Sequence, residues 1–528
     1  MEQSLIHRRR YAILGVLCLS LFISVVDNTI VNVTLPTLVR QLNASTSQLA
    51  WVVDAYSLVF AGLLLAMGSL GDRWGRKGAL QVGLALFIGF STVAAFTQTA
   101  GQLIAARAAM GIGAALIFPA TLAILANVFT DPRERAKAIG IWSAVVGAAV
   151  ALGPISGGFL LEHFWWGSVF IVNLPLGIIA LALGARLVPT SRDPEAPRLD
   201  VLGVVLSIAT IGGLVSTIIE APKHGWSSPL IIGSFVAIVV LGSAFVTWEA
   251  RSTHPMLDVK VFTNARFSAA SGSVMLAFFA LFGFIFLLTQ YLQFVRGYDT
   301  LAAGVRTLPF AFATGAVAPV APRLAHRFGT KRVVALGLVL MSVGFVVAAT
   351  IGRTTPYTVV AVSAIILGAG LGLTTSPATE SIMGSLPAEK AGVGSAVNDT
   401  TREVGGTLGV AVLGSLLASV YGSKVADGLA PLPLPADAKA LAGESVGAAF
   451  AVAQRVTEQA GAQAGGVVRA IASNAFMDGF HLGSWVAAGV TVVGSLGALA
   501  FLPARARAGS GASAAAEPAL TPQPELAI

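Results

Sequence analysis

Six ionisable residues lie inside stretches of this sequence that are otherwise apolar, and they are its first candidates for chemistry. They are Asp27, Asp54, Arg107, Glu380, Asp399 and Glu403. A charged side chain at the centre of a membrane costs roughly 2.5–3.5 kcal/mol, so a residue of this kind is a functional candidate by default. A low dielectric favours the protonated form of a carboxyl group and a bound cation favours the ionised form, so such acids can exchange protons for cations.

Asp27 stands in a polar stripe with Asn28, Thr29 and Asn32. Such a stripe must face the interior of a helix bundle or water. Two interpretations are open. Asp27 either exchanges a proton for a cation, or it is a structural carboxylate satisfied by neighbouring amides and a helix end.

Arg107 is always charged and cannot remain unpaired in an apolar environment. We expect its partner to be Asp27 or a polar cluster on the first or the fifth apolar stretch. Removing this arginine should destabilise the protein, and it should also uncouple the binding of protons from the binding of cations.

Asp399 and Glu403 stand four residues apart and therefore share one face of a helix, while Arg402 follows Asp399 by three residues. These acids either recognise a cation or a proton, or Asp399 and Arg402 form a self-satisfied pair. Glu380 is a further candidate for an interior position.

The composition places the chain in a membrane. Of the 528 residues, 55% are hydrophobic and 11% are charged, whereas soluble proteins contain about 25% charged residues. Runs of about 20 apolar residues predict an all-α membrane protein with fourteen transmembrane helices. The expected spans are 11–35, 47–69, 78–98, 102–127, 136–160, 166–187, 199–220, 229–248, 267–291, 301–322, 331–351, 357–384, 391–421 and 477–502.

Basic residues orient these spans. With a cytoplasmic N-terminus, 22 of the 33 Lys and Arg residues fall on the inner side and 9 on the outer side. This asymmetry predicts a multi-pass protein of the cytoplasmic membrane with both termini in the cytoplasm. It also explains the net charge of +8, so we expect no nucleic-acid partner. The single cysteine, Cys18, excludes a disulfide framework and a cysteine metal site.

An internal repeat divides the chain. The segment SLGDRWGRK (69–77) returns as RLAHRFGTK (323–331), and DPRERAKAIG (131–140) returns as LPAEKAGVG (386–394), at nearly the same offset. We therefore expect two parallel six-helix bundles with an inserted helix pair between them. The expected parts are an N-terminus (1–10), a first bundle (11–187), an inserted pair with its loops (188–266), a second bundle (267–502) containing an outer loop (422–475), and a disordered tail (503–528). The outer loop either lies on the membrane surface, caps the pore or is a passive linker.

Two groups of residues are candidates for conformational gating. The first is the charged turn with Gly68, Asp72, Arg73, Gly75, Arg76 and Lys77, and the second is the glycine-rich segment with Gly147, Gly153, Pro154, Gly157 and Gly158. We expect Asp72 to latch one conformation by accepting bonds from Arg73, Arg76 or a helix N-terminus. The alternative is a solvated loop that only sets the topology. In the repeat His326 takes the place of Asp72, so that latch should be weaker or pH-dependent. In the second group a proline kinks the helix and small residues allow another helix to approach closely.

Four motifs resemble the major facilitator superfamily, and in particular its fourteen-span drug:proton antiporter family. They are VVDNTIVNVTLP (25–36), GSLGDRWGRKGAL (68–80), LIAARAAMGIGAA (103–115) and GAAVALGPISGG (147–158). The resemblance implies proton-coupled export of amphipathic, often cationic, small molecules by a monomer, without a cofactor. It also implies a role for Asp399 and Glu403 in cation recognition or proton coupling. Asp54, in WVVDAY, would lie towards the outer mouth and assist cation release or proton entry, unless it is only a polar residue at the headgroup level.

One departure from the family concerns the tenth span. The segment LPFAFATGAVAPVAP (308–322) carries no acid, and Thr314 takes the place where exporters of divalent cations would have one. This favours monovalent or zwitterionic cargo. No GxxxxGK[ST] loop is present, so we expect no ATP drive. We also expect the protein not to be an enzyme. A dedicated exporter of an endogenous metabolite or lipid is the alternative, and a non-transporting sensor is a third hypothesis.

Overall fold

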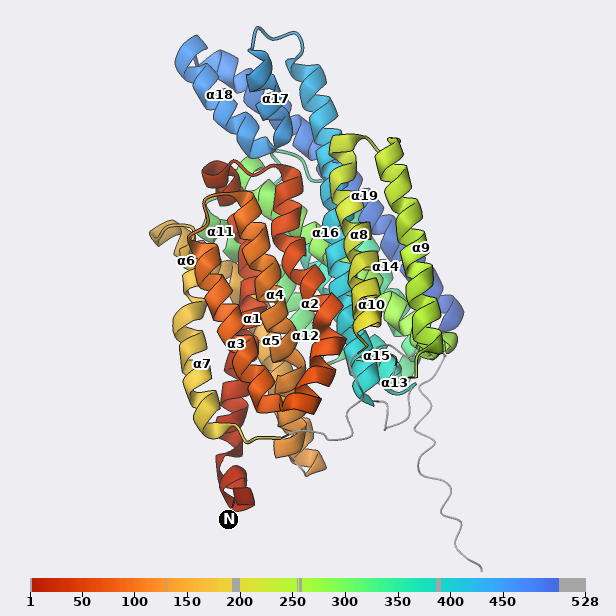
Figure 1. The fold of residues 1–528 in the computed structure, drawn as a ribbon. Coiled ribbons are helices and arrows are strands. Elements are labelled where there is room, and N and C mark those ends of the chain that lie inside the picture. Colours follow the sequence, from red (N-terminus) through yellow and green to blue (C-terminus); the bar gives the residue numbers. More distant parts are fainter. Residues whose placement is uncertain are drawn as a thin grey trace, which may run out of the picture.

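The computed structural model describes residues 2–129, 131–191, 200–253, 255, 259–385 and 391–502. These described residues form helices joined by short turns, and no strand occurs among them (Figure 1). The N-terminal half consists of α1 (Glu2–Leu42), α2 (Thr46–Trp74), α3 (Arg76–Ala95), α4 (Ala100–Val128), α5 (Pro132–His163), α6 (Ser168–Ile171) and α7 (Asn173–Leu187). The inserted pair is α8 (Val201–His224) and α9 (Pro229–Arg251).

The C-terminal half begins after a short 3-10 helix, η1 (Val259–Thr263). It consists of α10 (Ala265–Gln290), the π-helical turn η2 (Tyr291–Val295), α11 (Thr300–Val305), α12 (Leu308–Val317), α13 (Ala321–Phe328), α14 (Thr330–Ala348), α15 (Tyr357–Met383), α16 (Ala391–Leu429), α17 (Ala436–Glu444), α18 (Val446–Ala460) and α19 (Ala462–Phe501).

The predicted all-α membrane architecture is confirmed. In the described part of the chain, 13 helices are long and apolar enough to cross a membrane. They correspond to thirteen of the fourteen expected spans. The remaining one, 136–160, falls on the 32-residue helix α5, many of whose side chains lie outside the described residues.

The two repeated turns fold alike. Gly75 joins α2 to α3 with φ of 123°, and Gly329 joins α13 to α14 with φ of 93°. Only glycine adopts this backbone region without strain, which explains why both repeats carry it. Both turns lie at the end of the bundle that also holds the N-terminus, here called the basic end (Figure 1).

The tenth expected span, 301–322, is found among these 13 helices as Thr300–Val317, but it is not a regular helix, because α11, α12 and α13 divide the region. Pro309 and Pro322 lie in the first turns of α12 and α13. Proline has no N–H for the hydrogen bond to the preceding turn, so it starts a helix more readily than it continues one.

The last two spans are longer than expected. Helices α16 and α19 continue beyond the bundle, and α17 and α18 pack on their extensions at the end opposite the N-terminus, here called the cap end (Figure 1). Gly447 of α18 approaches Val39 of α1, and the ring of Phe450 meets that of Phe294 of η2 edge-on at 6.2 Å. The segment 422–475 therefore packs against both halves at the cap end.

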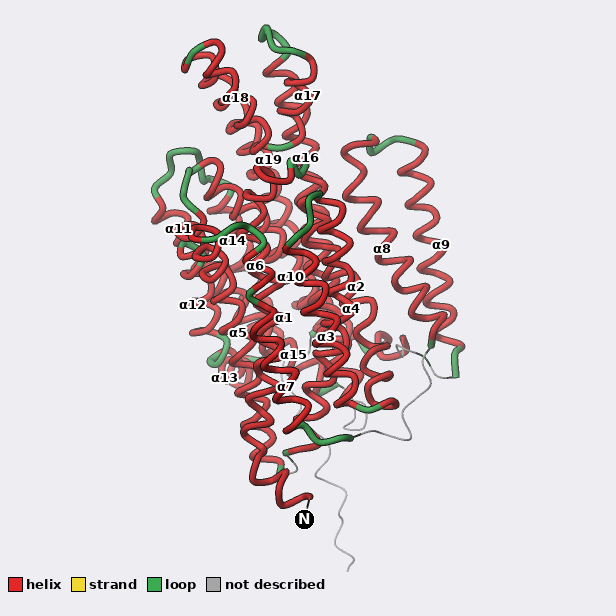
Figure 2. The backbone as a smooth tube through the Cα atoms, turned by 60° about the vertical axis from the view of Figure 1, so that its left-hand side comes forward, coloured by secondary structure: helices red, strands yellow, loops and turns green. Residues whose placement is uncertain are grey.

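Two pairs of helices make the most extensive contacts between the described parts of the two halves. Helix α2 packs against α16, and α5 packs against α11. The inserted pair stands at the side of the molecule (Figure 2), where α8 contacts both α2 and α16. The hydroxyl of Ser47 on α2 donates to the carbonyl of Ile219, and Ser415 of α16 donates to that of Ile218. The inserted pair is thus attached to both halves.

Candidate functional site

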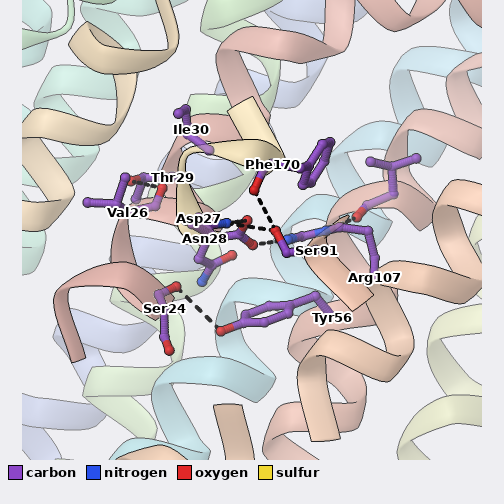
Figure 3. Close-up of polar contacts among 12 residues, drawn as sticks. Ser24, Val26, Asp27, Asn28, Thr29, Ile30, Tyr56, Ser91, Arg107 and Phe170 are labelled. Carbon is purple, nitrogen blue, oxygen red and sulfur yellow. Dashed lines mark hydrogen bonds and ion pairs between the residues drawn. The ribbon is translucent and has the colours of Figure 1, made fainter. Parts of the chain in front are cut away.

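A buried ion pair lies inside the N-terminal half (Figure 3). Asp27 of α1 and Arg107 of α4 are both 0% exposed, and Nη1 of Arg107 donates to the Asp27 carboxylate. The structure thus pairs Arg107 with Asp27, one of the two alternatives expected from the sequence. Removing one member of a buried pair leaves an uncompensated charge, so each of the two holds the other in place.

Two further side chains complete the environment of Asp27. Asn173, the first residue of α7, donates to the second carboxylate oxygen at 2.8 Å and to the hydroxyl of Ser91 on α3 at 2.9 Å. Ser91 donates in turn to the carbonyl of Phe170 at 2.8 Å. The sequence analysis missed Asn173 and Ser91. The sequence indicates a buried role for them only in that each is a polar residue within an apolar stretch.

Arg107 is held by helix α2 as well. Its Nε donates to the carbonyl of Val52 at 3.0 Å, and its guanidinium carbon lies 4.5 Å from the ring centroid of Tyr56. The Tyr56 hydroxyl donates to the carbonyl of Ser24 on α1 at 3.4 Å. All these partners belong to the N-terminal half, so Asp27 is enclosed within that half in this conformation and does not face the C-terminal half.

A second cluster lies between α15 and α16. Arg402 is 3.9 Å from the carboxylate of Asp399 and donates to the hydroxyl of Thr379 at 3.1 Å. Thr379 donates to Asn398, whose amide donates to Asp399. The side chains of Asp399 and Arg402 are each 32% exposed. The pair expected from the three-residue spacing therefore exists, but it is long and its members stay accessible.

Glu403 connects the two halves. Its carboxylate lies near the hydroxyl of Ser57 on α2 and one helical turn from Asp399. Two carboxylates at this spacing repel each other when both are ionised. A proton or a cation in their vicinity relieves that repulsion.

Asp54 lies on the part of α2 that faces α16. It is 0% exposed, and both its carboxylate oxygens lack a hydrogen-bond partner among the described residues. Ala50, one turn before it, approaches Gly414, and Ser57, one turn after it, lies near Glu403. Its burial follows from the close packing of α2 on α16.

The glycine-rich segment of α5 is where other helices come closest. A Cβ on Gly157 would lie 2.6 Å from Ile30 of α1, and one on Gly158 would lie 2.5 Å from the Cα of Leu301 on α11. Gly153 likewise faces Thr29 of α1, and Gly304 of α11 faces the carbonyl of Pro154. The side-chain surroundings of Gly147 lie outside the described residues. The expected close approach is therefore present, and it includes contact with the other half.

The charged turn at the basic end is joined to the end of α7. The N–H of Arg76 donates to the carbonyl of Ser191 at 2.9 Å, and Nζ of Lys77 donates to that of Ala185 at 2.8 Å. Arg73 is exposed, and a Cβ on Gly68 would meet Pro119 of α4 at 3.3 Å. The side chain of Asp72 lies outside the described residues, so its role as a latch stays a prediction.

The expected interior position of Glu380 is wrong. Its side chain is 47% exposed at the end of α15, and it lies 3.4 Å from Nε2 of His326. The broken tenth span explains this contact, because the short helix α13 brings His326 beside α15.

The helices and the buried charges together define a polytopic membrane protein with two linked helix bundles. The Major Facilitator Superfamily model matches residues 17–410, and the chain belongs to this family of membrane transporters. It is 38% identical to the multidrug efflux pump LfrA of Mycolicibacterium smegmatis over 84% of this chain and 88% of that protein. It is 37% identical to the methyl viologen resistance protein SmvA of Salmonella typhimurium over 81% of this chain and 86% of that protein. Among solved structures, a bacterial homologue of the lysosomal transporter Spinster shares the fold with a TM-score of 0.64 and 16% identity, covering 93% of this chain and 98% of that one.

Proposed function

We propose that this protein is a proton-coupled antiporter that exports amphipathic, often cationic, small molecules by alternating access. The observation that carries the proposal is the line of polar groups from the buried Asp27–Arg107 pair, along α2, to Glu403 of the other half. The name of one relative, a methyl viologen resistance protein, supports cationic cargo, and that of another, a multidrug efflux pump, supports drug export. Because methyl viologen is a dication, this relative does not support the restriction to monovalent or zwitterionic cargo expected from the tenth span.

Asp399 and Glu403 are the proposed site of exchange. They are partly exposed, they repel each other when ionised, and the ring of Phe278 lies 5.5 Å from the Arg402 guanidinium beside them. A cation that displaces Arg402 would gain both the carboxylates and an aromatic face. Protons arriving at the same carboxylates would release it.

Asp54 is the proposed proton carrier of this conformation. An ionised carboxylate that is buried without a partner is strongly destabilised, so the closed packing of α2 on α16 is compatible with a protonated Asp54. Separation of α2 from α16 would admit water and permit ionisation. Proton release would thus be tied to the movement of one half against the other.

We do not propose that Asp27 exchanges a proton for the cargo directly. Because Arg107 and Asn173 occupy its oxygens within the N-terminal half, we assign it to a switch that responds to charge and not to direct contact with cargo. We propose that α5 and α11 form a gate between the two halves. The glycines where these two helices meet determine how closely they pack.

We propose an orientation in the membrane, a division of the chain and a set of partners as well. We place the basic end in the cytoplasm by the positive-inside rule, with both termini there, in the cytoplasmic membrane. We propose that the chain is divided as the sequence predicts, into an N-terminus (1–10), a first bundle (11–187), an inserted pair with its loops (188–266), a second bundle (267–502) and a tail (503–528). The partners are the bilayer, protons and a small-molecule cargo, the working unit is a monomer, and the activity is transport without catalysis.

Dye efflux tests the proposal. Cells that lack their own pumps are loaded with ethidium, and efflux is followed with and without a protonophore. We expect the full chain to export the dye and the protonophore to abolish export while ATP is kept constant. Efflux that continues after the proton gradient has collapsed would show that proton coupling is wrong. Failure to export any of several amphipathic cations would show that the cargo class is wrong.

A further inference from the structure

The π-helical turn η2, at the end of α10, carries a side chain of the C-terminal half that contacts α1. Gln293 is 6% exposed, and its Nε2 donates to the carbonyl of Val33 at 2.9 Å. Another bond between the halves, from the hydroxyl of Thr300 to the carbonyl of Gly158, is longer at 3.4 Å. Gln293 therefore joins the two halves by a short and buried hydrogen bond.

The π-helical geometry of η2 changes the register of the side chains at the end of α10. The N–H of Arg296 donates to the carbonyl of Tyr291, five residues earlier, at 3.0 Å, whereas in an α-helix it would reach back four residues. One turn thus holds an extra residue, so the side chains of η2 do not continue the faces of α10. Such π-helical turns occur frequently at functional sites.

Residues on either side of Gln293 fix this turn to its own half. The hydroxyl of Tyr291, which is buried, donates to the carbonyl of Gly352 at 3.0 Å. Nη1 of Arg296 donates to the carbonyl of Thr355 at 2.9 Å. Both acceptors lie in the turn between α14 and α15. Because η2 is fixed to the C-terminal half, its bond to α1 must break when α1 moves away from that half.

The acceptor lies in a turn of α1 that a proline disturbs. Pro36 is inside α1, and proline has no N–H to donate to the preceding turn. Val33 stands three residues before it. A peptide carbonyl has two lone pairs, so that of Val33 can accept the bond from Gln293 without leaving the helix.

Helix α18 covers this contact at the cap end. Phe294 follows Gln293, is buried, and meets the ring of Phe450 of α18 as described above. Gly447 of α18 approaches both Phe294 and Val39 of α1. The elements η2, α1 and α18 therefore meet at one place, and separation of α1 from η2 would open the cap end there.

We propose that Gln293 is a gating residue that holds the cap end closed through its hydrogen bond to Val33. This inference rests on the proposed function, because alternating access requires the cap end to open. In the open state water would replace the bond for both groups, so its net contribution is that of an ordinary hydrogen bond, about fivefold in the population of the closed state. A contact of this strength favours closure and still permits opening.

Cysteine labelling of the purified full chain tests the proposal. Cys18→Ala removes the single native cysteine, and Val39→Cys places a reporter in a buried position where α1 meets α18. Gln293→Met keeps the length of the side chain and removes the donor. Gln290→Met is the matched control, because Gln290 is 1% exposed and its Nε2 donates to the carbonyl of Phe286, within its own helix, at 3.1 Å.

We expect a maleimide to label the reporter about fivefold faster in Gln293→Met than in the parent protein, and at the parent rate in Gln290→Met. Equal labelling rates in the two variants would overturn the proposal. If Gln293→Met does not fold, Gln293→Glu replaces it, since an ionised glutamate has the same shape and no hydrogen to donate. Above neutral pH it should also label faster than the parent, and an unchanged rate would contradict the latch.

The labelling readout needs neither cargo nor a proton gradient, so it is independent of the test of export. Faster labelling of Gln293→Met in a protein that exports no dye would support the gate and contradict the proposed cargo. Dye export by a protein whose labelling does not depend on Gln293 would leave the proposed function standing and overturn this inference alone.

Discussion

The hydroxyl of Ser57 on α2 lies near the carboxylate of Glu403 on α16, and this approach of the two halves is one residue away from Tyr56. The ring of Tyr56 packs against the guanidinium of Arg107, which holds Asp27. A movement of α2 relative to α16 therefore affects both the interface and the buried ion pair. Helix α2 therefore provides a physical connection between the interface of the two halves and the Asp27–Arg107 pair.

The Ser57–Glu403 contact should stabilise the arrangement in which α2 and α16 are packed together. Ser57→Ala removes the donor, and we expect a loss of about 1 kcal/mol from this state, a change of about fivefold in its population. Labelling of a cysteine introduced at the cap end, in a background without Cys18, measures the change. Ser57→Thr keeps the hydroxyl and should behave like the wild type. Equal labelling of Ser57→Ala and Ser57→Thr would contradict this role.

Arg107→Met should cost about 3–5 kcal/mol of stability, because Asp27 would remain buried without its cation. The measurement is unfolding of the purified protein in detergent. Asp27→Leu combined with Arg107→Met removes both charges and should recover most of that loss, while efflux should stay absent. If the double variant is as unstable as the single one, the pair does not act as a mutual constraint. If it transports normally, the pair is structural only.

The sequence was sufficient for the architecture, and it narrowed the partner of Arg107 to Asp27 or a nearby polar cluster. Apolar length predicted the spans, the repeated turns correctly placed Gly75 and Gly329 at equivalent corners, and the need to neutralise Arg107 pointed to Asp27. These inferences succeed because they depend on the cost of burying charge and on the conformation of glycine. Both can be evaluated from the sequence alone.

The sequence was insufficient where position depends on packing between distant helices. Nothing local marks Asn173 as a partner of Asp27, since the two are 146 residues apart. Nothing local marks Glu380 as a partner of His326 either, because the contact depends on the break in the tenth span that places α13 beside α15. Similarly, α16 and α19 continue past their apolar parts because α17 and α18 pack on the extensions, an effect that hydropathy does not report.

Gly158→Val should prevent α5 from closing on α11. A Cβ at this position would lie 2.5 Å from the backbone of Leu301, too close for packing without displacement of one helix. We expect efflux to fall strongly while the N-terminal half keeps its fold. Gly89→Val on α3, where a Cβ meets no atom within 4 Å, is the control and should retain efflux. Normal transport by Gly158→Val would show that this contact is not part of the gate.

Asp54→Asn separates a coupling acid from a structural one. The carboxyl group of Asp54 is fully buried and has no partner in the described part of the chain, so its charge contributes no stabilising bond that asparagine would remove. We therefore expect the thermal midpoint of the purified protein to be unchanged or raised, and proton-driven efflux to be lost. Asp399→Asn gives the comparison, because it would remove a contact to Arg402 and lower the midpoint slightly. A large loss of stability in Asp54→Asn would mean that the carboxylate is bonded and structural. Full efflux with normal stability would mean that the proton is carried elsewhere, and Glu403 would then be the remaining acid at this interface.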